Sequence, residues 1–177
     1  MSEKIEKEES VYSGKKISVK RAFTLCSNGK KALREKVVRK DGIAVLALDQ
    51  DQNVILERIY RYALNREILA LPCGKVEDGL SPLETAKKEL LEETGYLAKD
   101  WTELGKGYSA PSYSTECVYY FLARGLVQKE QRLEDDEELK VVRMPPDEFV
   151  KEIRSGEIDD AKSELCYYKS RDLTDHL

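Results

Sequence analysis

Three glutamates near the middle of the chain have the type and the spacing needed to hold a divalent cation. Glu89, Glu92 and Glu93 are three and four residues apart, so a helix would gather their side chains on one face. Carboxylate oxygens favour a hard ion such as Mg²⁺ or Mn²⁺, which keeps several waters and takes phosphate oxygens of a substrate as further ligands. Zinc is not expected, because it prefers His or Cys and the only histidine is His176. The alternative is an ordinary solvent-exposed acidic helix.

The element that must position these acids is a helix from about Pro82 to Thr94. Ser81 and Glu84 have the spacing of a capping box, and Pro82 suits the first helical position. Gly95 suits the left-handed conformation in which helices commonly end. The stripe expected to face the core contains Leu83, Ala86, Leu90 and Leu97.

From Gly74 to Tyr96 the sequence resembles the Nudix box. That pattern is Gly, five residues, Glu, seven residues, then Arg-Glu-aliphatic-any-Glu-Glu-any-Gly-aliphatic, and the segment from Glu89 to Tyr96 matches its end in register. Two positions depart from it, because Leu80 replaces the first Glu and Lys88 replaces the Arg. If those two residues normally support one another, losing both avoids leaving one charge alone. Lysine does not reproduce a two-pronged guanidinium contact, so the orientation of the neighbouring acids is in question.

The resemblance extends beyond the box to the ADP-ribose pyrophosphatase branch of the Nudix hydrolases and covers about four-fifths of the chain. In that branch a proline stands sixteen residues after the last box glycine, and Pro111 has this spacing from Gly95. Two further departures are Ala70 in place of a common Glu and Ser112 in place of a common Gly. The matching segments are 41–49, 58–62, 66–74, 108–116, 134–138 and 155–162.

The resemblance implies hydrolysis of the pyrophosphate bond of ADP-ribose or a related nucleoside diphosphate sugar, giving a nucleoside monophosphate and a sugar phosphate. It implies that Mg²⁺ (or Mn²⁺) is held by Glu89, Glu92 and Glu93 and by the backbone carbonyl of Cys73. The Cys73 thiol itself is expected to pack rather than to act as a nucleophile, since no histidine is near it in sequence.

The general base and the substrate contacts follow from the same resemblance. For the general base, Glu137 is the first choice and Asp135 the second. The base could also be an acid of the box itself, where Glu93 is the main catalytic candidate. Arg61 resembles a residue that meets substrate phosphate or ribose, and its forked donors suit that role. Arg58 could serve similarly. The alternative for Arg58 and Arg61 is ion pairing with acids on the strand surface. The expected substrate-binding residues are Arg58, Arg61, Pro111, Tyr113 and Glu116.

The predicted fold is α/β: a Nudix-type α/β/α sandwich with a mixed sheet, preceded by an N-terminal antiparallel β segment. Residues 1–9 are highly charged and are expected to be frayed. A turn is predicted at residues 27–29. The resemblance implies a homodimer in which residues 1–40 form the dimerisation segment and residues 41–177 form the Nudix domain. Strands are predicted near 16–25, 33–40, 42–48, 53–61, 66–70, 102–108, 116–124 and 139–144, and further helices at about 146–155 and 160–170.

Composition describes an ordinary soluble domain. The chain has 177 residues, 41% hydrophobic, with a net charge of -4 and no basic run, so nucleic acid is not an expected partner. Four widely spaced cysteines and the lack of a signal peptide or long apolar run indicate a cytoplasmic protein that does not enter a membrane. Two other interpretations stay open: a degenerate Nudix domain that binds a nucleotide without efficient hydrolysis, and a structural or interaction protein.

Overall fold

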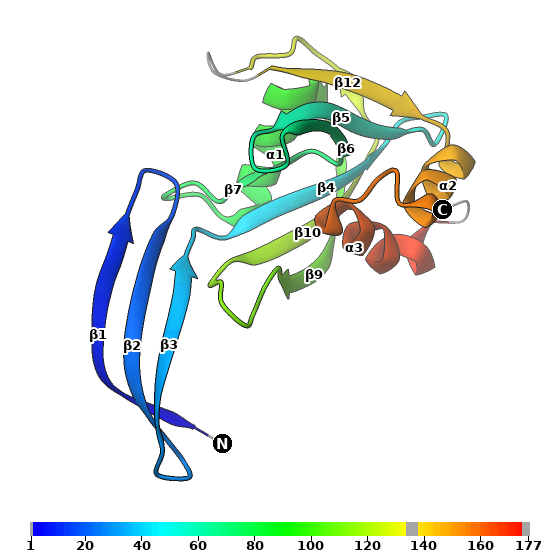
Figure 1. Cartoon of the computed structure of the whole chain (residues 1–177). Coiled ribbons are helices and arrows are strands. Elements are labelled where there is room, and N and C mark those ends of the chain that lie inside the picture. Colours follow the sequence, from blue (N-terminus) through cyan, green and yellow to red (C-terminus); the bar gives the residue numbers. More distant parts are fainter. Residues whose placement is uncertain (1, 134–137, 175–177) are drawn as a thin grey trace. The chain divides into compact units, whose positions relative to one another are not determined.

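The computed structural model describes residues 2–133 and 138–174 and contains two compact units (Figure 1). One unit comprises Met1–Asp41 and Tyr108–Cys117, and the other comprises Gly42–Gly107 and Val118–Leu177. Among the described residues, no helix is both long enough and apolar enough to cross a membrane.

The first unit contains a three-stranded antiparallel sheet in the order β1-β2-β3. Its strands are β1 (Glu3–Ser13), β2 (Ser18–Cys26) and β3 (Lys31–Val38). The predicted turn at residues 27–29 is confirmed: Gly29 has a φ of +79°, and its amide donates to the carbonyl of Cys26 at 2.9 Å. A residue without a side chain suits this left-handed position.

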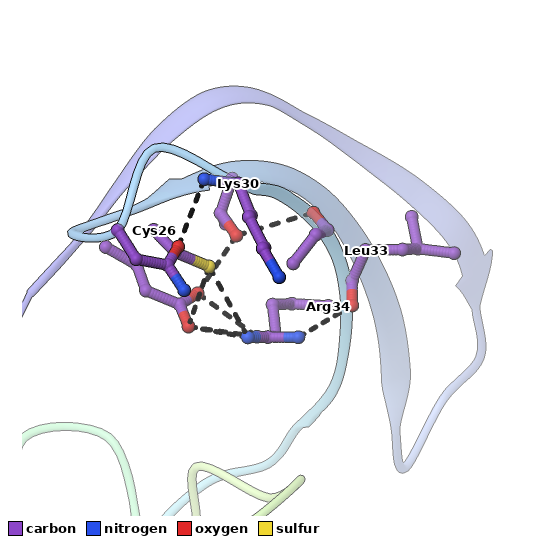
Figure 2. A network of polar contacts seen from close by, with 8 residues as sticks. Cys26, Lys30, Leu33 and Arg34 are labelled. Atoms are coloured by element: carbon purple, nitrogen blue, oxygen red, sulfur yellow. Dashed lines mark hydrogen bonds and ion pairs between the residues drawn. The ribbon is translucent and has the colours of Figure 1, made fainter.

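The prediction that residues 1–9 are frayed is wrong, because Glu3–Ser13 forms β1. The charges that suggested fraying instead find opposite charges on the neighbouring strands. Glu8 pairs with Lys20 at 3.0 Å and with Lys36 at 2.8 Å. The guanidinium of Arg34 on β3 reaches across β2 to the Glu3 carboxylate at 2.6 Å and also donates to the Leu33 carbonyl at 3.2 Å (Figure 2). The pair of Glu8 with Lys20 joins adjacent strands and stabilises their pairing, whereas Lys36 and Arg34 link β3 to β1 across β2.

The second unit contains a seven-stranded mixed sheet with the main order β12-β5-β4-β10-β9, in which β6 pairs with β5 and β7 with β4. The pairing of β10 with β4 is parallel, whereas β4, β5, β6, β7 and β12 pair antiparallel. A separate two-stranded sheet joins β8 (Tyr96–Leu97) to β11 (Val127–Gln128). The main strands are β4 (Gly42–Leu48), β5 (Val54–Arg61), β6 (Arg66–Ala70), β7 (Cys73–Lys75), β9 (Asp100–Tyr108), β10 (Cys117–Arg124) and β12 (Leu139–Met144).

Both faces of this sheet are covered, which confirms the α/β/α sandwich. Because side chains alternate along a strand, the buried residues of β4 divide between two apolar clusters. Ala44 and Leu46 belong to the cluster with Phe149 and Tyr167, which come from α2 (Pro146–Ser155) and α3 (Ala161–Ser170). Ile43, Val45 and Ala47 belong to the other cluster, which contains Ala86 and Leu90 from α1 (Pro82–Thr94). A short 3₁₀ turn, Arg171–Leu173, follows α3.

Helix α1 begins and ends where its capping residues predict. Ser81 accepts a hydrogen bond from the Glu84 amide at 3.3 Å, and the Glu84 carboxylate accepts one from the Ser81 amide at 2.8 Å. Gly95 ends the helix with a φ of +72°. The predicted apolar stripe is wrong at Leu97, which is 39% exposed in β8 because the helix has already ended.

Replacing Ser81 with Ala is expected to lower the free energy of unfolding by about 1 kcal/mol, since the Glu84 amide loses its acceptor. Urea unfolding followed by circular dichroism measures this change. Ser112→Ala, at an exposed loop position, is the control and is expected to unfold like the wild-type protein. Equal stability of the two variants would contradict the role of Ser81 as a cap.

Candidate metal and substrate site

Strand β7 and helix α1 approach each other closely at Gly74, the first residue of the acidic segment Gly74–Tyr96. Gly74 pairs with Ile43 of β4, which fixes its backbone at the edge of the sheet layer. A Cβ added at Gly74 would lie 2.7 Å from Cγ of Glu89 and would overlap its carboxylate. Only glycine leaves this space, so the sequence places the Glu89 carboxylate directly over the β7 backbone.

The three glutamates of α1 differ in their burial. Glu93 is 5% exposed and follows the buried Ala86 and Leu90 on the same stripe, whereas Glu89 and Glu92 are half-buried. In the described ranges, no three His, Cys, Asp or Glu side chains are grouped so that they alone could hold a metal ion. This donor set fits an ion such as Mg²⁺, which takes one or two carboxylates and completes its shell with water and substrate phosphate. The assignment of Glu89, Glu92 and Glu93 to a metal stays a prediction.

Lys88, at the position expected to be Arg, has an acidic partner that the sequence pattern did not indicate. Its Nζ lies 2.6 Å from Oε1 of Glu77 and 3.6 Å from Oε2 of Glu92. The hydrogen bond with Glu77, outweighing desolvation and supported by Glu92, raises the pKa of the Lys88 ammonium. Glu77 stands three residues before Leu80, the residue in place of the usual Glu. The loss of a carboxylate at position 80 is therefore accompanied by an ion pair of Lys88 with a nearby acid.

Replacing Glu77 with Gln is expected to weaken cation binding at Glu92, because Lys88 then has only Glu92 as an ionic partner and competes with the cation there. An exposed ion pair contributes up to about 1 kcal/mol, which corresponds to roughly fivefold in affinity. Calorimetric titration with Mn²⁺ measures the effect, and Glu103→Gln, an exposed residue of β9, is the control. In a Lys88→Met background the Glu77 change is expected to have no further effect. A full fivefold loss in that background would refute the link through Lys88.

Cys73 is half-buried at the start of β7, and its thiol accepts a hydrogen bond from Nη2 of Arg61 at 3.5 Å. Desolvation, together with the charges of Glu93 and Glu57 and against those of Lys162 and Arg61, raises the pKa of this thiol to about 12. The thiol is therefore protonated at neutral pH, which agrees with the expectation that it packs rather than attacks. The contact also brings Arg61, a predicted substrate residue, to the strand that begins the acidic segment.

The other arginine candidate, Arg58, lies elsewhere on β5. Its cross-strand partners are Leu69 on β6 and Lys140 on β12, and its side chain is exposed. Tyr60, two residues further, is 51% exposed and donates its hydroxyl hydrogen to Oδ1 of Asn65 at 2.8 Å. Arg58 and Tyr60 therefore present polar groups on the surface of β5, and their role in substrate binding stays a prediction.

The remaining substrate candidates lie in the first unit, in the loop between β9 and β10. Pro111 is exposed and Tyr113 is 58% exposed, while the carbonyl of Tyr113 accepts a hydrogen bond from the Val37 amide at 2.7 Å. The Glu116 carboxylate pairs with Arg39 at 3.2 Å and accepts a hydrogen bond from Ser109 Oγ at 2.7 Å. Glu116 thus holds the two ends of this loop together, a structural role that its position in the sequence did not indicate.

The two candidates for the general base, Glu137 and Asp135, lie outside the described residues. Within the described part, sequence reasoning missed Glu77. The available signal was an acid in the loop before the helix, in a segment where Lys88 replaces the usual Arg. It also missed Glu57, a carboxylate with 0% exposure on β5. The available signal for Glu57 was its position directly after the apolar residues 54–56 of a predicted strand.

Comparison with known proteins identifies the family of this chain. A family described as NUDIX domain matches residues 38–163. The ADP-ribose pyrophosphatase of Bacillus subtilis (strain 168) is 35% identical over 165 residues, which cover 92% of this chain and 89% of that protein. The methanol dehydrogenase activator of Bacillus methanolicus is 31% identical over 166 residues, with 93% and 90% covered.

The fold is shared with a solved structure of an ADP compounds hydrolase, at a TM-score of 0.88 and 24% identity, with 98% of this chain and 94% of that one covered. The glycine-to-glutamate approach between β7 and α1, the acidic helix and the family match lead to one conclusion. The chain belongs to the Nudix family and is similar to its ADP-ribose pyrophosphatases.

Proposed function

We propose that this chain is a metal-dependent pyrophosphohydrolase of ADP-ribose or a related nucleoside diphosphate sugar. The observation that carries the proposal is the arrangement of α1 against β7, with Glu89 over Gly74 and Glu93 buried one helical turn further on. In the reaction, water attacks one phosphorus atom and the bond from that phosphorus to the bridging oxygen breaks. The products are a nucleoside monophosphate and a sugar phosphate.

Glu89, Glu92 and Glu93, with the backbone carbonyl of Cys73, would hold the divalent cation. When bound, Mg²⁺ or Mn²⁺ supplies neutralisation of the phosphate oxygens and lowers the pKa of a water molecule. Lys88 balances the charge of Glu92 and Glu77 on the outer side of the helix. Glu93, held in a buried position, is the catalytic candidate of the box, while Glu137 and then Asp135 are proposed for removal of the proton from the attacking water.

Arg61 and Arg58 are proposed to bind the phosphate or ribose groups of the substrate through their forked donors. Pro111, Tyr113 and Glu116 are proposed to contribute to substrate choice. The exposed ring of Tyr113 suits stacking on a base. The close contact of Arg61 with Cys73 supports the first of these roles, because it keeps the guanidinium beside the strand that leads into the acidic helix.

A panel of ADP-ribose, GDP-mannose, UDP-glucose and diadenosine polyphosphates, each with Mg²⁺ or Mn²⁺, tests the proposal. Release of the nucleoside monophosphate and sugar phosphate, separated by chromatography, is the expected result for ADP-ribose or another nucleoside diphosphate sugar. Tight nucleotide binding with no turnover would instead support a degenerate domain. The ion pair of Lys88 with Glu77 weakens that alternative, since it supplies an acidic partner for the residue that stands in place of the box arginine.

We also propose that the protein is a cytoplasmic homodimer in which residues 1–40 form the dimerisation segment and residues 41–177 the Nudix domain. Exposed apolar side chains of the first unit support association through its sheet. All four cysteines are free, which suits a reducing compartment. Light scattering coupled to gel filtration tests the dimer. The apolar side chains are Ile5, Val11, Tyr12, Phe23 and Leu33, between 44% and 56% exposed.

A further inference from the structure

The loop between β9 and β10 is joined to strand β3 by backbone hydrogen bonds. The Val37 amide donates to the Tyr113 carbonyl at 2.7 Å, and the Thr115 amide donates to the Val37 carbonyl at 3.1 Å. The two bonds lie on either side of Ser114, which forms a parallel bridge with Val37. This is the pattern of a parallel ladder, and it covers the outer edge of β3, which ends the order β1-β2-β3. The loop is therefore an extension of the sheet of the first unit.

The Thr115 side chain adds a second connection just beyond this bridge. Its hydroxyl accepts a hydrogen bond from the Arg39 amide at 3.0 Å and donates one to the Arg39 carbonyl at 3.2 Å. The Arg39 guanidinium pairs with the Glu116 carboxylate at 3.2 Å, and the Cys117 amide donates to the Asp41 carboxylate at 3.2 Å. The end of the loop thus depends for its position on the chain segment that follows β3.

Burial does not account for this second connection, because Thr115 and Arg39 are both exposed. At an exposed position water satisfies the backbone amide and carbonyl of Arg39 equally well, so no penalty for buried polar groups requires the Thr115 hydroxyl. What the hydroxyl supplies is a fixed geometry, since one short side chain bonds both the donor and the acceptor of the same residue. Its effect is to restrict the motion of the loop relative to β3.

Tyr113 is the residue that this attachment presents to solvent. Its amide donates to the Ala110 carbonyl at 3.1 Å, and the Ser114 amide donates to the same carbonyl at 2.8 Å, so a tight turn precedes the contacts with β3. The backbone of Tyr113 is thus held at both its amide and its carbonyl, while the residue is 58% exposed. An aromatic ring on a fixed backbone meets a ligand with little loss of conformational freedom, because the loop is ordered beforehand.

We propose that Thr115 is a positioning residue for the substrate: it ties the loop to Arg39 and so holds the Tyr113 ring where it stacks on the base of a nucleoside diphosphate sugar. The inference rests on the proposed function, because that function makes Tyr113 a substrate contact. Strand β3 then has a role besides association, since it fixes the loop that contributes to substrate choice. A loop that the substrate must first order binds it more weakly but leaves the hydrolytic step unchanged, so the effect falls on KM and not on kcat.

Steady-state hydrolysis of ADP-ribose, or of the sugar nucleotide in the panel that is hydrolysed fastest, tests the proposal. Thr115→Val keeps the shape of the side chain and removes the hydroxyl, and it is expected to raise KM by about fivefold to tenfold at unchanged kcat. Thr115→Ser keeps the hydroxyl and is expected to retain the wild-type KM. Thr102→Val, the same change at an exposed position of β9, is the control and is expected to leave both constants unchanged.

A second set of variants asks whether Thr115 acts through Tyr113. Tyr113→Ala alone is expected to raise KM, because the stacking ring is lost. In the Tyr113→Ala background, Thr115→Val is expected to have no further effect on KM, since the two changes remove the same interaction. Amide hydrogen exchange of the loop, measured on the same proteins, is expected to be faster in Thr115→Val than in Thr102→Val.

The outcomes separate this inference from the proposed function. If the wild-type protein hydrolyses its substrate and Thr115→Val keeps the wild-type KM, the inference is wrong and the proposed function stands. Faster exchange in Thr115→Val with an unchanged KM would show that the bond to Arg39 is structural only, which overturns the inference as well. A rise in KM that persists in full in the Tyr113→Ala background would refute the link through Tyr113. Wild-type protein that hydrolyses nothing in the panel overturns the proposed function, and the inference falls with it.

Discussion

Glu93→Gln is expected to abolish most of the hydrolytic activity while leaving the fold intact. The substitution removes one charge from the buried face of α1 and keeps the volume of the side chain. Loss of about 3–4 kcal/mol of transition-state stabilisation, the scale of a metal-held charge, lowers kcat by roughly 10² to 10³. The thermal stabilisation caused by Mg²⁺ in the wild-type protein is expected to disappear as well, because a ligand that binds only the folded state must stabilise it.

Glu84→Gln is the matched control for this experiment. It makes the same chemical change on the same helix, but Glu84 closes the capping box, where glutamine serves equally well. Activity and stability are therefore expected to stay at wild-type values. Hydrolysis rates and Mg²⁺-dependent unfolding temperatures of both variants decide the result. A Glu93→Gln protein with wild-type turnover and metal affinity would show that Glu93 is not part of the metal site.

Gly74→Ala is expected to have the second large effect, and a selective one. The new methyl group would overlap the Glu89 carboxylate and lie 2.7 Å from its Cγ. The side chain of Glu89 can turn away, so the cost in stability is small, but its carboxylate leaves the β7 backbone. Misplacement of a catalytic group by about 1 Å is enough to lower the rate on the order of 10²-fold.

Gly107→Ala on β9 is the control for the glycine change. Its Cβ would meet Leu165 Cδ2 at 3.4 Å, an ordinary packing distance. Both variants are examined by urea unfolding and by kcat with saturating metal. Gly107→Ala is expected to remain near wild type in both. A Gly74→Ala protein that lost stability but kept its full kcat per folded molecule would contradict the prediction. In that case the β7 backbone would have moved to make room for the methyl group, and the Glu89 carboxylate would have kept its place.

Local signals explain why α1 and its acids could be predicted from the sequence. Ser81, Glu84 and Gly95 fix the two ends of the helix through contacts within a few residues, so the face that carries Glu93 follows from helical geometry. The strands of the second unit were also predictable, because runs such as 42–48 are apolar throughout. The three-layer arrangement then follows from the need to cover both faces of the sheet.

The features that could not be predicted depend on contacts between distant segments. The strand at Glu3–Ser13 looks frayed by composition, and only its partners, such as Arg34, make its charges favourable. The ion pair of Lys88 with Glu77 depends on the path of the loop after β7. The place of Glu57 opposite Ala70 depends on the register between β5 and β6, which no local pattern specifies.

The charged strand β1 also determines how the first unit meets other molecules. As an outer strand of its sheet it presents unpaired backbone groups to solvent, a template that could recruit strands from other chains. Its pairing with β2 shifts register between Ile5 and Lys7 and again between Ser10 and Tyr12, and such bulges twist an edge away from new partners. Lysines and glutamates along the strand oppose the same process. Growth into fibres along this edge of the sheet is therefore disfavoured.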